Sequence, residues 1–272
     1  MDTDAELVDR ARAGERAALD ELVRATKDLV FNLAVRMLGS VADAEDATQE
    51  ILIKIVTHLA SFRGDSAFRT WAYRVAANHL LTTRKRGAEL RVASFEQLGE
   101  ALDANLVAGD RAVDDQLLVR EAKLICTSMM LACLDRDHRL AFVLGEIFEF
   151  ASDEGAAVLE ISSDAFRKRL SRARERMAAF MGAQCGLADP RNACRCAKQA
   201  GHAVAAGQLD PRRLAWGPLG CRPAPKLERV ADIDSVARAI EVFRSNPNFV
   251  APEAVLAGIK QVLGAGSSDL LS

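Results

Sequence analysis

Apolar residues recur at helical spacing from Asp4 to about Arg86, with breaks at Gly14, at "LGSV" and at "FRGDS". This pattern is typical of amphipathic helices packed into one small domain. In "DAEDATQEILIKIVTHLASF" one face of the predicted helix is apolar and carries Ala47, Ile51, Ile55, Leu59 and Phe62. A second face is acidic and carries Asp43, Asp46 and Glu50, three and four residues apart.

The next predicted helix, "FRTWAYRVAANHLLTTRKR", has its own apolar stripe, formed by Phe68, Trp71, Ala72, Val75 and Ala76. It ends in the basic cluster Arg84, Lys85 and Arg86, which suits a helix C-terminus. From residue 87 to about 114 the periodicity weakens and Gly and Asp become frequent, which predicts a tether between two domains.

A second helical domain is predicted from about residue 115 to 181. Its predicted core positions are Leu117, Leu118, Leu124, Met130, Leu134, Phe142, Val143 and Ile147. Near its end, "SSDAFRKRLSRARERM" has one narrow apolar stripe, Phe166, Leu170, Ala173 and Met177, and basic residues on the remaining surface. A short helix over 152–159 and a turn over 160–162 precede it, so the order is helix, turn, basic helix.

A basic helix in this arrangement fits the DNA major groove, where arginine and lysine contact phosphates and guanine edges. Either Ser162 or Ser163 can cap its start. The alternative is a solvated basic helix face, which is common. We favour DNA binding.

Residues 182–272 differ in character, being rich in Cys, Gly and Pro before a final helical stretch from about 233 to 263. The predicted fold class is therefore all-α: two small helical domains joined by a linker, plus a small C-terminal helical, cysteine-containing extension. The predicted boundaries are 1–86, 87–114, 115–181 and 182–272.

Composition narrows the class of protein. The 272 residues carry a formal net charge of −2, so a nucleic-acid surface must be local and balanced by acidic segments. The acidic N-terminus lacks a signal pattern and no apolar run approaches the length of a membrane span, which predicts a cytoplasmic protein with no membrane partner. No phosphate-binding glycine loop, zinc-protease helix or nucleophile arrangement is present, so we expect no enzyme activity.

The extension offers a candidate metal set, Cys185, Cys194, Cys196, Cys221 and His202. Thiolate and imidazole ligands suit zinc or copper, although the "CRC" spacing is not that of a zinc knuckle. Reduced thiols that pack a small domain or respond to oxidation are an equally consistent alternative.

The two halves together resemble bacterial RNA polymerase sigma factors of the extracytoplasmic-function (ECF) class, over about residues 4–181. In the first half the resemblance rests on "DAEDATQEILIKIVTHLASFRGDSAFRTWAYRVAANHLL", and in the second on "LDRDHRLAFVLGEIFEFASDEGAAVLEISSDAFRKRLSRARERM". Either motif alone is moderately specific, whereas the pair in this order is strong. The resemblance implies a region 2 domain, a region 4 helix-turn-helix domain, and function as a sigma factor that binds core RNA polymerase and promoter DNA.

The resemblance also implies roles for individual residues. The residues implied to contact the polymerase are Asp43, Asp46, Gln49 and Glu50. Contact with the minus-ten promoter element falls to Tyr73, Arg74, Asn78, His79, Arg84, Lys85 and Arg86. Contact with the minus-thirty-five element falls to Ser163, Arg167, Lys168, Arg169, Ser171, Arg172 and Arg174, of which Arg169 and Arg174 are also suited to neighbouring side chains. Phe68, Trp71 and Val75 are assigned to the core.

Four residues depart from the family pattern: Gly155, Glu160, Ala165 and Lys168. Gly155 lies within the first helix of the helix-turn-helix, where glycine costs about 1 kcal/mol relative to alanine. Glu160 replaces the usual turn glycine. We hypothesise that the extension regulates the protein in cis, and an anti-sigma partner is left open. The alternatives are a conventional helix-turn-helix regulator and a helical metal-binding or sequestering protein.

Overall fold

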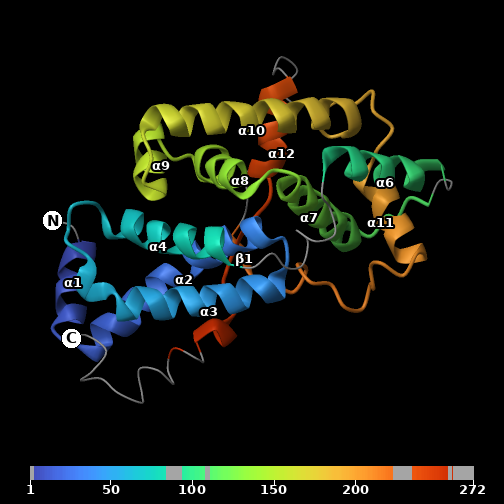
Figure 1. The fold of residues 1–272 in the computed structure, drawn as a ribbon. Coiled ribbons are helices and arrows are strands. Elements are labelled where there is room, and N and C mark those ends of the chain that lie inside the picture. The colour runs from blue at the N-terminus through green and yellow to red at the C-terminus, as the bar shows by residue number, and fades with distance from the viewer. Residues whose placement is uncertain (1–2, 84–93, 108–110, 223–234, 257–258, 260–272) are drawn as a thin grey trace.

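The computed structural model describes residues 3–83, 94–107, 111–222, 235–256 and 259. Figure 1 shows helices almost throughout, with one short two-stranded sheet among the described residues. The expected all-α class is confirmed. No helix in the described ranges is both long and apolar enough to span a membrane.

The first half forms one layer of the molecule. It consists of α1 (Thr3–Arg12), α2 (Arg16–Leu38), α3 (Val41–Thr57), the 3₁₀ turn η1 (Leu59–Ser61) and α4 (Phe68–Thr82). Helix α2 stops at Gly39, whose φ of 64° is the left-handed conformation common after a helix. The Ser40 hydroxyl then accepts the Asp43 N–H and starts α3. The apolar stripe expected on α3 is buried at every predicted position.

The second half lies above the first in Figure 1. It consists of α7 (Gln116–Ala132), α8 (Arg136–Phe142), the π-helical turn η2 (Val143–Ile147), α9 (Ser152–Leu159) and α10 (Ser163–Gln184). Asp115, Asp135 and Ser162 cap α7, α8 and α10 by accepting backbone N–H groups. The prediction of a core position is wrong for Leu117, which is 57% exposed, and correct for its neighbour Leu118, which is buried.

The segment expected to be a plain tether contains helix α6 (Phe95–Val107), so that expectation is wrong for residues 95–107. Leu98 and Leu102 are buried and the Phe95 ring packs against Phe180 of α10, with 5.0 Å between ring centroids. The Gly and Asp content of this segment is typical of a tether, but Phe95, Leu98 and Leu102 form a short apolar stripe that packs α6 against the core. The domain boundaries themselves stay a prediction.

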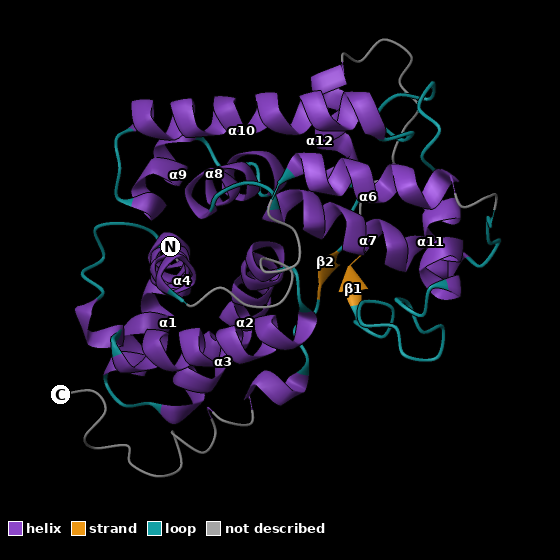
Figure 2. Ribbon diagram, turned by 45° about the vertical axis from the view of Figure 1, so that its right-hand side comes forward, coloured by secondary structure: helices purple, strands orange, loops and turns teal. Residues whose placement is uncertain are grey.

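The extension runs along both halves. It contains α11 (Cys196–Ala205), β1 (Cys221–Arg222), α12 (Ser235–Arg244), β2 (Asn248–Phe249) and the turn η3 (Glu253–Leu256). Strands β1 and β2 pair antiparallel, with Cys221 opposite Phe249. Helix α11 packs on α7, α12 packs on α10, and the chain then passes to α2 and α3. Figure 2 shows β1 and β2 beside α2, at the junction of the two layers. Buried residues of both halves and of the extension thus share one continuous core.

Candidate nucleic-acid interface

A hollow of about 270 Å³ lies between the "FRGDS" loop and helix α4. The loop turns at Gly64, whose φ of 79° is a conformation that residues with a side chain seldom adopt. An aromatic cluster of Phe62, Phe68 and Trp71 supports the hollow, with ring centroids 5.6–5.7 Å apart. The residues that line it are Ser61, Phe62, Arg63, Asp65, Ser66, Trp71 and Arg74. A hollow with aromatic rings and hydrogen-bonding groups suits an unstacked nucleotide base.

Of these lining residues, the sequence predicted a DNA contact only for Arg74, whereas Phe62 and Trp71 were assigned to apolar stripes. Arg63, Asp65 and Ser66 were missed because "FRGDS" was interpreted only as a helix break. The signal was present, since a polar loop of unusual conformation between two helices is where binding groups are often found. Phe68 and Trp71 are buried as predicted, and Val75 is half-buried against the same core.

Tyr73, expected to contact DNA, is buried in this structure and only 3% exposed. Its ring packs against Phe148 and Phe150 of the second half, with centroids 5.8 and 5.0 Å away, and Arg69 lies over both Tyr73 and Phe150. Burial raises the pKa of the Tyr73 hydroxyl. The expectation of an accessible Tyr73 is wrong for this arrangement, because contacts between the two halves cover the ring.

Arg74, on the same helix, is half-buried and lies 3.7 Å from the Glu160 carboxylate at the turn of the helix-turn-helix. His79 is also buried, with Nε2 3.4 Å from Glu50 and Nδ1 2.9 Å from the Lys54 ammonium. Burial, and then the Lys54 charge, lower the pKa of His79. His79 therefore links α4 to α3 here, and its contact with DNA stays a prediction. Asn78 is exposed as that role requires. The predicted contacts Arg84, Lys85 and Arg86 lie outside the described residues.

The helix-turn-helix has the predicted form. Helix α9 covers 152–159, and the Ser162 hydroxyl accepts the Ala165 N–H at the start of α10. The departures at Gly155 and Glu160 have a structural explanation. A Cβ on Gly155 would lie 2.3 Å from Cζ of Phe166, so the glycine makes room for that buried ring. Glu160 adopts a left-handed φ of 53°, the conformation of the glycine it replaces.

The outward face of α10 is basic. Its apolar stripe, Phe166, Leu170, Ala173 and Met177, is buried as predicted. Lys168 and Arg172 are exposed and have no ion pair or hydrogen bond to another side chain in the described part of the chain. Three further predicted contacts bond to nearby polar side chains at the surface: Ser163 to Asp153, Arg167 to Asp164, and Ser171 to Glu175.

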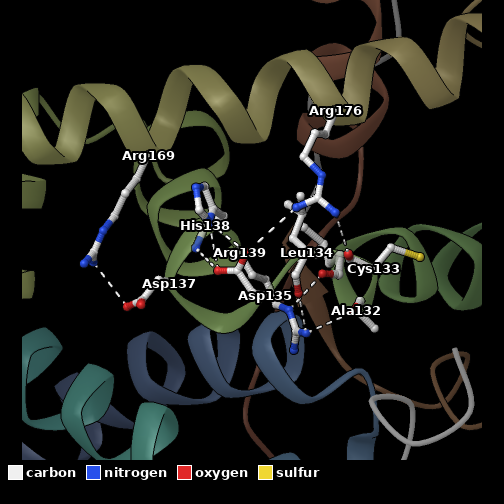
Figure 3. A network of polar contacts seen from close by, with 10 residues as sticks. Ala132, Cys133, Leu134, Asp135, Asp137, His138, Arg139, Arg169 and Arg176 are labelled. Atoms are coloured by element: carbon white, nitrogen blue, oxygen red, sulfur yellow. Dashed lines mark hydrogen bonds and ion pairs between the residues drawn. The ribbon is translucent and has the colours of Figure 1, made fainter. Parts of the chain in front are cut away.

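Arg169 and Arg174 point back into their own half of the molecule. Arg169 lies 3.2 Å from Asp137, and Arg174 pairs with Glu146, whose side chain is 3% exposed. In Figure 3 Arg169 and Arg176 both reach from α10 toward the turn before α8, where Arg176 lies 3.8 Å from Asp135. Of the two roles considered for Arg169 and Arg174, contact with neighbouring side chains describes this arrangement, and DNA contact does not.

Arg139, also drawn in Figure 3, holds this turn in place. It is buried and donates to the carbonyl oxygens of Leu131, Ala132 and Leu134, and to that of Met37 in α2. A side chain of the second half therefore satisfies backbone groups at the end of a helix in the first half. This contact holds α8 against the end of α2.

The acidic face of α3 is at the surface. Asp46 and Glu50 are exposed, whereas Asp43 and Gln49 are half-buried. Nothing in the structure tests the polymerase contact, which stays a prediction.

The cysteines are distributed differently from the predicted metal set. Cys185, Cys194 and Cys196 line one small cavity, and the fourth thiol there is Cys126 of α7. Cys221 is exposed and its sulfur accepts a hydrogen bond from Arg120, while His202 is buried in α11. Across the described residues no three potential ligands are placed so that they could hold a metal ion. Zinc or copper binding stays a prediction.

Comparison with known proteins covers both halves. Residues 22–89 match the family model for Sigma-70 region 2, and residues 124–177 match that for Sigma-70, region 4. The RNA polymerase sigma-H factor of Pseudomonas aeruginosa is 32% identical over 184 residues, which are 64% of this chain and 92% of the relative. The ECF RNA polymerase sigma-E factor of Escherichia coli K12 is 32% identical over 177 residues, 64% of this chain and 91% of the relative.

Two solved structures are also similar. One is CnrH in complex with the cytosolic domain of CnrY, with 25% identity and a TM-score of 0.47 over 66% of this chain and 97% of the other. The second is RpoE in complex with the anti-sigma factor NepR from Bartonella quintana, with 19% identity and a TM-score of 0.40 over 60% of this chain and 96% of the other. Residues 178–272 lie outside both family matches.

Proposed function

The chain belongs to the ECF class of sigma-70 family RNA polymerase sigma factors, and from this premise we propose how its surfaces share promoter recognition. As a sigma factor it binds core RNA polymerase and directs transcription initiation at promoter DNA. The two family matches in one chain disfavour a conventional helix-turn-helix regulator and a metal-sequestering protein. We place its action in the cytoplasm beside the polymerase, without enzyme activity of its own.

Promoter DNA is assigned to two surfaces. The hollow between the "FRGDS" loop and α4 takes an unstacked base of the minus-ten element, with Arg63 and Asp65 as hydrogen-bonding groups at its edge. Lys168 and Arg172, on the outward face of α10, contact the minus-thirty-five element in the major groove. Asp46 and Glu50 form the exposed part of the polymerase-docking face on α3.

The arrangement described above, with Tyr73 covered by Phe148 and Phe150, is called here the closed arrangement. It keeps part of the minus-ten surface inside the protein, because α4 faces the second half rather than solvent. An active sigma factor must separate its two halves to expose this face. The closed arrangement is therefore a resting form.

One observation supports regulation in cis: residues 244–253, called here the latch, bond to both halves. At the upper end Arg244 donates to the Glu146 carbonyl oxygen at 2.8 Å and lies 3.2 Å from Glu149, in the second half. At the lower end Lys27 of α2 donates to the Ala251 carbonyl oxygen and pairs with Glu253 at 2.8 Å.

The middle of the latch is bound by two buried side chains of α2. The Asn32 amide accepts the Phe249 N–H at 2.9 Å and donates to the Phe249 carbonyl oxygen at 2.7 Å. Arg36 donates to the Pro247 carbonyl oxygen and to the Asn248 side chain, and its guanidinium lies over the Phe148 ring. Burial lowers the pKa of Arg36 to about 10. These contacts join the first half, the second half and the extension at one place, so the latch holds the closed arrangement.

Run-off transcription with core RNA polymerase and DNA from upstream of the protein's own gene tests both parts of this proposal. The full chain is expected to give transcripts that require the promoter. Phe249→Ala removes a buried ring that packs on Trp216 and is expected to raise transcript output by freeing the latch. Arg212→Ala, at an exposed position of the extension, is the control and should behave as the unchanged chain.

Promoter binding that needs no polymerase, with no transcripts, would refute the sigma function. Transcripts from the full chain that stay equal in Phe249→Ala would refute only the regulation in cis. An anti-sigma partner remains an additional proposal, tested by adding the purified chain to a lysate and asking whether a bound protein suppresses these transcripts.

A further inference from the structure

Thiols from three parts of the chain meet at one cavity. Cys126 comes from α7 in the second half, Cys185 directly follows α10, and Cys194 and Cys196 lie at the start of α11. All are free thiols in this structure. The cavity has a volume of about 20 Å³, enough for a single water-sized body.

The walls of this cavity do not suit water. Besides the thiols they are formed mainly by aliphatic side chains, Leu102, Ala122, Met130 and Leu187. A buried water needs two to four polar partners. The amide group of Gln199, which lies 3.6 Å from the Cys194 sulfur, already bonds Asn105 and the Leu102 carbonyl oxygen. The four thiols therefore line a mostly apolar cavity, in which the Cys194 sulfur accepts a hydrogen bond from Gln199.

Cys185 and Cys194 are paired through the backbone. They form a parallel β-bridge, and neighbouring strands lie about 4.7–4.9 Å apart. Disulfide bonds join Cα atoms about 4.4–6.8 Å apart, so the pair has a backbone spacing that a disulfide can span. Both residues also line the same cavity, which brings the pair together there.

The loop between them is built for this close approach. A Cβ on Gly186 would lie 2.2 Å from the Cys194 carbonyl oxygen, so the two segments can be this close only because residue 186 is glycine. Asn192 donates to the carbonyl oxygens of Gly182 and Cys185, which fixes the loop against the end of α10. Gly186 and Asn192 thus both stabilise the close approach of the Cys185 and Cys194 segments.

We propose that Cys185 and Cys194 are a site of reversible oxidation, at which a peroxide converts the two thiols to a disulfide. One thiolate attacks a peroxide oxygen and becomes a sulfenic acid, releasing one water. The second sulfur then attacks the sulfenic sulfur, forming the S–S bond and releasing a second water. Two thiols and one hydrogen peroxide thus give one disulfide and two waters, and a dithiol reductant reverses the reaction.

The surroundings of the pair set its rate. Burial raises the pKa of Cys194, so little of its thiolate is present at neutral pH. Attack on peroxide by Cys194 is therefore slow. This fits a cytoplasmic protein, whose thiols are reduced by default and whose disulfides are transient.

The bond would join the end of the recognition helix α10 to the segment that enters α11. It would close the loop 185–194 near Lys123, whose ammonium bonds Ser245 of the latch at 2.7 Å. The proposal does not depend on the proposed function, because formation of the bond is measured on the protein alone.

The experiment treats the purified full chain with hydrogen peroxide, alkylates the remaining thiols and maps the peptides by mass spectrometry. A peptide pair cross-linked between Cys185 and Cys194 is expected, with loss of two hydrogen atoms per chain and recovery on reduction. Cys221→Ser, which removes an exposed thiol, should leave the cross-link unchanged. Cys194→Ser should abolish it while circular dichroism shows the same helix content.

Four outcomes would overturn the proposal. These are cross-links to a different cysteine, oxidation only to sulfinic acid, full alkylation of both thiols after peroxide, and one tightly bound zinc per purified chain that is lost in Cys194→Ser. The zinc outcome would show a metal site in place of a redox pair. Because the first three are measured on the unchanged sequence, they do not depend on whether the variant folds.

Discussion

Replacing Asn32 by alanine tests whether the latch is held where the structure places it. Asn32 is only 6% exposed, and its amide makes two hydrogen bonds with the Phe249 backbone. Each buried hydrogen bond contributes about 1 kcal/mol net, so Asn32→Ala should weaken docking of the latch by about 2 kcal/mol. At 1.4 kcal/mol per factor of ten, this is an increase of about 30-fold in the undocked fraction.

Hydrogen exchange measures this fraction. The Val250 N–H donates to Gly220 and the Ala251 N–H donates to the Asp28 carboxylate, so neither loses its own partner in the variant. Exchange of both amides is expected to rise about 30-fold, while amides in the middle of α3 keep their rates. Thr57→Ala is the control, because its hydroxyl bonds only within its own helix and to His58.

A change of less than threefold at Val250 and Ala251 would show that the latch is not held through Asn32. An equal acceleration in α3 would instead show that the substitution destabilises the whole first half. Either result would refute the assignment of a local docking energy to these two bonds.

Three further predictions concern single residues. Gly155→Ala should lower the free energy of unfolding by about 1–3 kcal/mol, measured in urea, because the new Cβ meets the Phe166 ring; a gain of about 1 kcal/mol, as usual for glycine in a helix, would contradict this packing. His79, whose pKa is lowered by burial and by a nearby ammonium group, is harder to protonate when folded, so its contribution to stability is complete above about pH 6.5 and is lost as the pH falls below that value. A His79→Gln variant should lose this part of the pH dependence of thermal unfolding. If its pH dependence is the same as that of the unchanged chain, a group other than His79 causes it. Lys168→Ala should weaken promoter binding by the polymerase complex by about 1–3 kcal/mol without changing the melting temperature, whereas Arg174→Ala should lower the melting temperature; the reverse pattern would exchange their roles.

Local features were predictable from the sequence. The span of α9 and the buried stripe on α10 follow from spacing within a few residues, and both predictions are confirmed. Of the two candidate caps, Ser162 and Ser163, the structure uses Ser162. The prediction for Leu117 was wrong because two adjacent leucines near a helix start fit the same apolar stripe. Only the packing of α7 decides which of them is buried.

Contacts between distant segments were not predictable in this way. Tyr73 has the pattern of a surface aromatic on α4, and its burial depends on Phe148 and Phe150, more than seventy residues away in the chain. Cys126 joins the other thiols because α11 packs on α7, which no spacing within either helix reveals. The hollow beside α4 was missed for the opposite reason: its loop is local, but its role depends on the aromatic cluster beneath it.

The position of the latch in the chain has a consequence for how the protein is made. Both halves leave the ribosome before residues 244–253 do, and about 70 residues separate the end of the second half from the end of the latch. At 5–20 residues per second, synthesis of that interval takes on the order of 4–14 s. During these seconds the nascent chain already has both promoter-facing surfaces but not the segment that fastens them together. Under the proposed regulation in cis, capture of a newly made chain by polymerase competes with completion of its own extension, so the outcome depends on the rate of translation.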